Sequence, residues 1–178
     1  MLAVTWTVPN LQYVNALQGP VDFRTFVGLG FLDVHVEMTV DSAQNVTSRL
    51  TFMGDALGMA VQPGDVISAS MCLDTSPPTR ANVVLANETS QKTESFSFDA
   101  GLPPAVVINA GVSRGSAKPR NPLALFGAVY FDEISAYTTA GHRSLTGGEV
   151  TTMVDDNGST LARAFRITDY TFKVVRND

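Results

Sequence analysis

The sequence predicts an all-β protein in which two antiparallel sheets pack face to face as a sandwich or jelly roll. Apolar and polar residues alternate with a period of two in short runs from one end of the chain to the other. Glycine, proline, asparagine or aspartate separates these runs, as expected at turns. Apolar residues at helical spacing are always interrupted by β-branched clusters or turn residues, so we expect no amphipathic helix longer than two turns.

The alternating runs define the expected strands. In "VISASMCL", for example, Ile67, Ala69 and Met71 share one face. In "QPGD" (62–65) and "DNGS" (156–159), a glycine stands where a tight turn requires a positive φ. So many short strands at near-regular spacing are typical of two packed antiparallel sheets. The expected strands are 4–8, 24–29, 33–41, 48–53, 66–73, 81–87, 94–99, 105–109, 126–131, 148–154, 161–167 and 170–176.

Length and composition limit the function classes. A chain of 178 residues fits one domain, 1–178, with a core large enough to need no disulfide, and the single Cys72 is expected to pack as a small apolar side chain. A net charge of −5 argues against a nucleic-acid partner. No apolar run approaches the roughly 20 residues that span a bilayer, and the N-terminus lacks the pattern of a secretion signal, so no membrane partner is expected. No cofactor is expected, and compartment and oligomeric state stay open.

The run "DVHVEMTVD" (33–41) carries the most polar candidate surface. On a strand, Asp33, His35 and Glu37 share one face, which is either plain solvent-exposed surface or the lining of a groove. His35 and Glu37 are close enough for a proton-transfer pair or a shared metal, but Asp33 and Glu37 lie about 13 Å apart on an extended strand. We expect no metal site. "GVSRG" places Ser113 in a G-x-S-x-G pattern, but no helix is expected after it, so we do not interpret it as a nucleophile.

Several stretches together resemble the glutamic peptidase (eqolisin, G1) family, in nearly the family's order along about 170 residues. The resemblance implies a concanavalin A-like sandwich, similar to legume lectins and glucanases, with a substrate groove on the concave face of a sheet. It also implies an endopeptidase in which a Gln and a Glu activate a water and stabilise the oxyanion, and it leaves secretion possible. The stretches are "VTWTVPN" (4–10), "FVGLG" (26–30), "VQPGDVISASM" (61–71), "VVLANETS" (83–90), "PLALFGAVYFDEISAYTT" (122–139) and "NGSTLARAFRITDYTFKVV" (157–175).

The resemblance also assigns site positions. Glu37, in "HVEMTV", stands at the family's Gln position, in a register that a slip of one residue would change. Val106, in "AVVIN", stands at the family's Glu position and cannot carry a proton. Phe26 replaces a family tryptophan, and Phe52 remains from the aromatic segment of the cleft; with His35, these side chains are expected to bind ligand in the groove.

Three functions follow as alternatives. The first is a glutamic-peptidase-like sandwich that has lost the Gln/Glu pair and binds a ligand or serves structurally. The second is an acid-acting endopeptidase with rearranged residues around Glu37. The third is a lectin-like carbohydrate-binding module, for which Tyr13, Tyr137 and Tyr170 are the candidate stacking residues. The expected partner is therefore a peptide or a carbohydrate in the concave groove.

Overall fold

The computed structural model describes residues 1–15, 19–74, 79–101, 107–115, 122–138 and 140–177. The described part contains strands and no helix. The strands are β1 (Leu2–Thr7), β2 (Val21–Leu29), β3 (Leu32–Val40), β4 (Val46–Phe52), β5 (Asp55–Ala56), β6 (Val66–Leu73), β7 (Arg80–Asn87), β8 (Lys92–Asp99), β9 (Ile108–Ser113), β10 (Ala128–Thr138), β11 (Gly141–Arg143), β12 (Thr152–Val154), β13 (Thr160–Arg166) and β14 (Phe172–Arg176).

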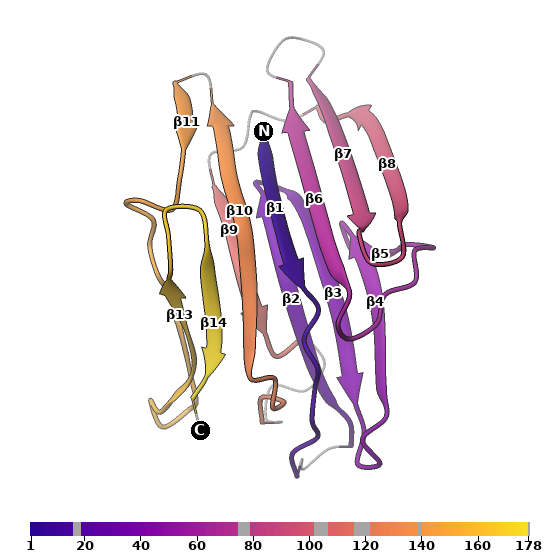
Figure 1. Cartoon of the computed structure of the whole chain (residues 1–178), viewed down its shortest axis with the longest axis vertical. Coiled ribbons are helices and arrows are strands. Elements are labelled where there is room, and N and C mark those ends of the chain that lie inside the picture. Colours follow the sequence, from indigo (N-terminus) through magenta and orange to yellow (C-terminus); the bar gives the residue numbers. More distant parts are fainter. Residues whose placement is uncertain (16–18, 75–78, 102–106, 116–121, 139, 178) are drawn as a thin grey trace.

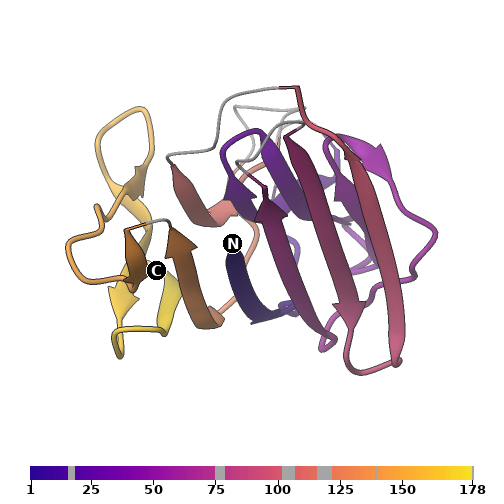
Figure 2. The ribbon, with the colours of Figure 1, turned by 90° about the horizontal axis from the view of Figure 1, so that it is seen from above.

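The strands form two antiparallel sheets that lie one behind the other (Figure 1). The nine-stranded sheet has the order β12-β13-β14-β10-β1-β6-β7-β8, with β11 paired to β10. The five-stranded sheet has the order β5-β4-β3-β2-β9. Seen from above, the two sheets form two layers, and β13 and β14 extend to one side past the five-stranded sheet (Figure 2). The two-sheet fold class predicted from alternation is therefore confirmed.

The core fills the space between the two sheets. Along β3, every second residue from Leu32 to Val40 is buried, and the residues between them face outward. Aromatic rings pack in the core: Phe131 stacks on Phe172 of the neighbouring strand with ring centroids 4.7 Å apart, and Phe23 lies 4.9 Å from Phe126. Period-two burial therefore separates the side chains of β3 that face the core from those that face the outer surface.

Two buried polar side chains, Trp6 and Asn87, form hydrogen bonds between segments of the sandwich that are distant in sequence. Trp6 is 1% exposed, and its Nε1 donates a hydrogen bond of 3.1 Å to Thr25 Oγ1 on the other sheet. Asn87 is fully buried and donates from Nδ2 to Asp65 Oδ2 at 2.7 Å and to the Ala60 carbonyl at 3.1 Å. Although Asn87 begins an N-x-T sequon, its amide nitrogen is buried and hydrogen-bonded, so it is not a surface acceptor for a glycan.

The turns and strand ends mostly match the sequence pattern. Gly64 and Gly158 have φ of 92° and 82°, as the two turn motifs predicted. The run predicted as a strand at 105–109 differs: β9 begins at Ile108 and continues to Ser113, while 102–106 lie outside the described residues. Ser113 thus ends a strand that pairs with β2, and it does not occupy a strand-to-helix turn. In the described part of the chain, no helix is long and apolar enough to cross a membrane.

Candidate functional site

The outer face of the five-stranded sheet, meaning its surface away from the core, collects polar side chains at matched levels of β9, β2, β3 and β4. At the first level, Asn109 and Asp33 stand on either side of Gly28. At the next level, in the order β9 to β4, are Gly111, Phe26, His35 and Thr51; the third level holds Ser113, Arg24, Glu37 and Arg49. Strand register alone therefore brings together residues from four separate segments.

Glu37 is held by two arginines on the neighbouring strands. Its Oε1 lies 2.5 Å from Arg24 Nη2, and its Oε2 accepts a 2.7 Å hydrogen bond from Arg49 Nε and lies 2.5 Å from Arg49 Nη2. Partial burial by itself raises the pKa of Glu37, but the hydrogen bond from Arg49 and the positive charges of both arginines outweigh burial and lower this pKa. The Glu37 carboxylate is therefore a firmly ionised partner of two cations, which makes it a weak proton acceptor.

His35 lies beside Asp33 on the same strand. Its Nε2 is 3.1 Å from Asp33 Oδ2, and its ring meets the edge of Phe26 at a centroid distance of 6.5 Å. Burial, followed by the charge of Arg24, lowers the pKa of His35, and the nearby carboxylates of Asp33 and Glu37 only partly oppose this. His35 is therefore neutral near pH 7, with Nε2–H placed to donate to Asp33.

Two glycines make room for side chains on this face. A Cβ built on Gly28 would overlap Asn109 Oδ1 and lie 3.3 Å from Asn109 Cγ, so the Asn109 amide crosses over β2 toward β3. A Cβ on Gly111 would lie 3.2 Å from Cζ of Phe26, so that ring leans over β9. Replacement of either glycine would displace a side chain of the outer face.

A hollow of about 420 Å³ opens next to the Glu37 level. Its lining includes Asp22, Arg24, Glu37, Arg49 and Gly115. Asp22 Oδ1 accepts a 3.2 Å hydrogen bond from Thr39 Oγ1. The hollow is therefore lined by the Arg24–Glu37–Arg49 ion pairs and by the Asp22 carboxylate, which is bonded to a neutral hydroxyl.

The predicted site residues do not all meet on this face. Glu37, His35 and Phe26 share it. Phe52 lies on the opposite face of the sheet, is 7% exposed, and stacks on Phe96 of the other sheet at 5.2 Å, so it belongs to the core and does not line the outer surface. The period of two explains this difference, because β4 turns Thr51 and Phe52 to opposite sides. Val106 lies outside the described residues.

Sequence reasoning missed Arg24, Arg49 and Asn109. The two arginines fall within predicted strands, and alternation alone would have placed them on the outer face. Their contact with Glu37 depends on the register in which the neighbouring strands pair, and the sequence alone does not determine this register. Asn109 stood at the end of a predicted strand, but nothing in the sequence indicated that Gly28 leaves room for its side chain.

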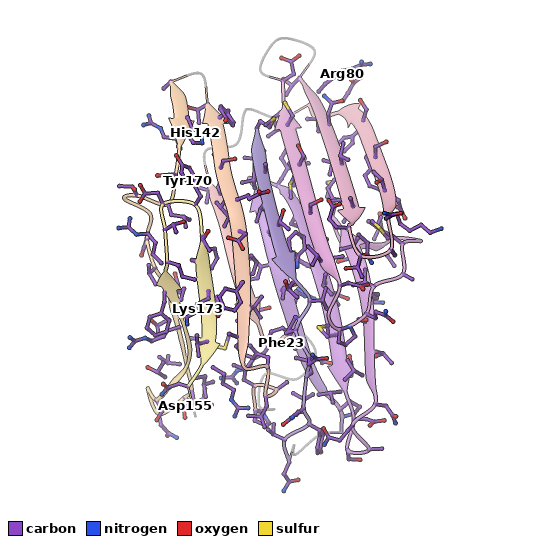
Figure 3. The ribbon with its side chains drawn as sticks, viewed as in Figure 1. Phe23, Arg80, His142, Asp155, Tyr170 and Lys173 are labelled. Carbon is purple, nitrogen blue, oxygen red and sulfur yellow. The ribbon has the colours of Figure 1, made fainter. Side chains whose placement is uncertain are left out.

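The nine-stranded sheet carries a separate group of exposed aromatic rings. His142 lies between Tyr137 and Tyr170, with ring centroids 4.7 Å and 5.4 Å away. Figure 3 shows His142 and Tyr170 on the same side of the molecule. The two tyrosines are 53% and 42% exposed. Tyr137 and Tyr170, which are far apart in sequence, therefore form one stack through His142, whereas Tyr13 is not part of it.

Among the described residues, no group of three or more His, Cys, Asp or Glu side chains is arranged to hold a metal ion. Asp33 and His35 form a pair, and Glu37 turns to the arginines. The described face thus offers hydrogen-bond donors and acceptors, ion pairs and the aromatic rings of Phe26 and His35 as its means of binding.

The Peptidase A4 family model matches residues 3–174, and the chain belongs to this family. Comparison with curated proteins gives no match.

Solved structures show the same fold at low sequence identity. Scytalido-glutamic peptidase with a transition state analog inhibitor superposes with a TM-score of 0.71 at 15% identity, covering 99% of this chain and 91% of that one. SCP-B, an eqolisin in complex with the tripeptide Ala-Ile-His, gives a TM-score of 0.74 at 14% identity over the same shares. Aspergilloglutamic peptidase from Aspergillus niger gives a TM-score of 0.66 at 14% identity, covering 88% of this chain and 99% of that one.

Proposed function

We propose that this chain is a non-catalytic member of the Peptidase A4 family that binds an extended peptide along the outer face of the five-stranded sheet. The observation that carries the proposal is the double ion pair of Glu37 with Arg24 and Arg49. A general base must accept a proton near the working pH, and two guanidinium groups oppose that change. Valine at position 106, where the family resemblance expects the catalytic glutamate, supports the same conclusion.

Peptide is the favoured ligand class for two reasons. On the outer face, the Asn109 amide and the Asp33 carboxylate can form hydrogen bonds with a peptide main chain. The ring of Phe26 offers an apolar contact beside them. Such a mixture of a few placed polar groups and an apolar contact suits an extended chain with alternating side chains. In addition, the similar SCP-B structure carries the tripeptide Ala-Ile-His, and a second structure of scytalido-glutamic peptidase, at 15% identity, carries a peptide based transition state analog.

The test is a binding and recovery experiment with a mixture of short synthetic peptides. ¹⁵N-labelled protein is titrated with the mixture at pH 7 and pH 4, and the peptides are then examined by mass spectrometry. We expect amide shifts concentrated around Phe26, His35 and Glu37, and peptides recovered intact. Shifts confined to the nine-stranded sheet, or no shifts at all, would refute the peptide site, and cleaved peptides would refute the non-catalytic assignment.

A carbohydrate ligand is the second candidate, and the stack of Tyr137, His142 and Tyr170 favours it. Exposed aromatic rings offer an apolar face with polar edges, a surface on which sugar rings pack. On a glycan array, binding that disappears in Tyr137→Ala and persists in Tyr130→Ala would support this function. Tyr130 is the matched control because it is 44% exposed and interacts with Lys173 instead of the stack.

A further inference from the structure

The outer face of the five-stranded sheet carries opposite charges at two of its levels. At the first level, Asp33 contributes a negative charge, and its neighbour His35 is neutral near pH 7. At the third level, Arg24 and Arg49 flank Glu37, and the Arg49 side chain is 66% exposed. Asp22, bonded to Thr39, also lines the hollow beside this level, so the positive charge that a ligand meets there is the exposed Arg49 guanidinium and not a net excess. A ligand that lies along β3 therefore meets the Asp33 carboxylate at one end and the exposed Arg49 guanidinium at the other.

The separation of these two ends defines a ligand length. Asp33 and Glu37 are four residues apart on one continuous strand, which corresponds to about 13 Å. An extended peptide advances about 3.3–3.6 Å per residue. The two charged levels therefore match the two ends of a peptide of about four residues.

The negative end has the geometry for an ammonium group. The Asn109 oxygen occupies the place that a Cβ of Gly28 would take, and Asp33 stands directly opposite Gly28. Directly opposed Cβ positions in neighbouring strands lie about 4.5–5.5 Å apart. The amide oxygen and the carboxylate thus approach from two sides, and an ammonium group has three N–H donors to share between them.

The positive end has donors available for a carboxylate. Arg49 directs Nε and Nη2 to Glu37 Oε2, and its side chain is 66% exposed. A guanidinium has five N–H donors, so a pair with one carboxylate oxygen does not use them all. Glu37 fixes the positions of Arg24 and Arg49 beside the hollow of about 420 Å³.

We propose that this face recognises both free ends of a short peptide of about four residues, the ammonium group by Asp33 and Asn109 and the carboxylate by Arg49. The inference rests on the proposed peptide-binding function and defines its ligand class. The middle residues of the ligand pass over Phe26, which offers an apolar contact between the two ends. Glu37 acts as a positioning residue, because it holds the arginines and does not itself contact the ligand.

The test compares four forms of one peptide, Ala-Leu-Leu-Ala: unmodified, N-acetylated, C-amidated and capped at both ends. Affinities are measured by NMR titration of the labelled protein at pH 7. Each cap removes one charge, and we expect each to weaken binding about tenfold, with the doubly capped form weakest. A length series from three to seven residues with free ends should show strongest binding near four.

Variants assign each end to its residue. In Asp33→Asn, N-acetylation should no longer change the affinity, while C-amidation still weakens it. In Arg49→Gln, C-amidation should no longer change the affinity, while N-acetylation still weakens it. Arg80→Gln is the matched control. Arg80 is an arginine of similar exposure, 63%, and it pairs with Asp99 within the nine-stranded sheet, away from the proposed site. Thermal unfolding of each variant verifies that the fold is retained.

The outcomes separate this inference from the function on which it rests. If no form of the peptide binds, the peptide-binding function itself fails. If all four forms bind the native protein equally, peptide binding stands and recognition of the free ends is refuted. If N-acetylation weakens binding equally in Asp33→Asn and in the native protein, Asp33 does not bind the ammonium group.

Discussion

Arg24 Nη2 lies 2.5 Å from Glu37 Oε1 in a directly opposed pair between β2 and β3. The two side chains are 22% and 21% exposed, so water screens this pair less than it screens Arg49 on the far side of Glu37. The contact holds the Glu37 carboxylate between two cations, so Glu37 should contribute to the stability of the fold. Its consequences are measurable as stability.

Glu37→Gln should lower the free energy of unfolding at pH 7, by on the order of 1 kcal/mol. Because the pKa of Glu37 is lowered in the folded state, its stabilising contribution is present above the ordinary value of 4.5 and is lost as the pH falls through the lowered value. Urea unfolding between pH 7 and pH 2 should therefore show the difference from the native protein shrinking in acid. Glu149→Gln, at an exposed loop position, is the control, and a pH-independent difference would contradict the ion-pair account.

His35 should make the protein less stable as the pH falls below its ordinary pKa of 6.5. Because its pKa is lowered in the folded state, the unfolded chain binds more protons between the two values, so stability increases with pH in that window. His35→Gln should flatten the dependence of unfolding free energy on pH between pH 8 and pH 5. In the control His142→Gln, the unfolding free energy should still depend on pH as in the native protein. If His35→Gln also keeps this dependence, a group other than His35 causes it.

The buried Asn87–Asp65 contact should be among the most sensitive positions of the fold. Asn87→Ala leaves the Asp65 carboxylate, which is 4% exposed, without a 2.7 Å donor, and should cost about 3 kcal/mol of unfolding free energy. Asn87→Asp places a second carboxylate there and should cost more at pH 7 than at pH 4, because protonation relieves the repulsion. Chemical denaturation at both pH values measures this. Equal losses for Asn87→Asp at the two pH values would show that repulsion is not the cause.

Gly28→Ala should move the Asn109 side chain with little loss of stability. The atom that a new Cβ meets is the far end of an exposed side chain, so rotation of Asn109 relieves the contact at a cost below about 1 kcal/mol. The loss should vanish when Asn109→Ala is added, and a double-mutant cycle on unfolding free energies measures this coupling. Additive effects of the two substitutions would mean that the Asn109 side chain does not occupy the space above Gly28.

The fold could be predicted from local pattern because each strand carries its own signal. Period-two alternation identified most strands, and the turn glycines Gly64 and Gly158 have the backbone conformation that their motifs predicted. Strand ends near 105–113 were less predictable, because Asn109 is the single polar side chain in "VVINAGV" and the run shows no alternation that marks where pairing begins.

The candidate site could be predicted only in part, because it depends on pairing between distant segments. Alternation placed His35 and Glu37 on one face of a strand, and the structure agrees. The partners of Glu37 depend on the register of β2 and β4 against β3, and the place of Asn109 depends on a glycine 81 residues earlier in the chain. Phe52 was assigned from resemblance without regard to strand parity, and it lies in the core.

The most direct test of the central claim is proteolysis. Acid-denatured protein substrate is incubated with the native chain and with Glu37→Gln at intervals from pH 2 to pH 7, and new amino termini are measured. We predict that neither releases termini above the rate of the substrate alone. Cleavage by the native chain would contradict the account, and its loss in Glu37→Gln would identify Glu37 as a catalytic group.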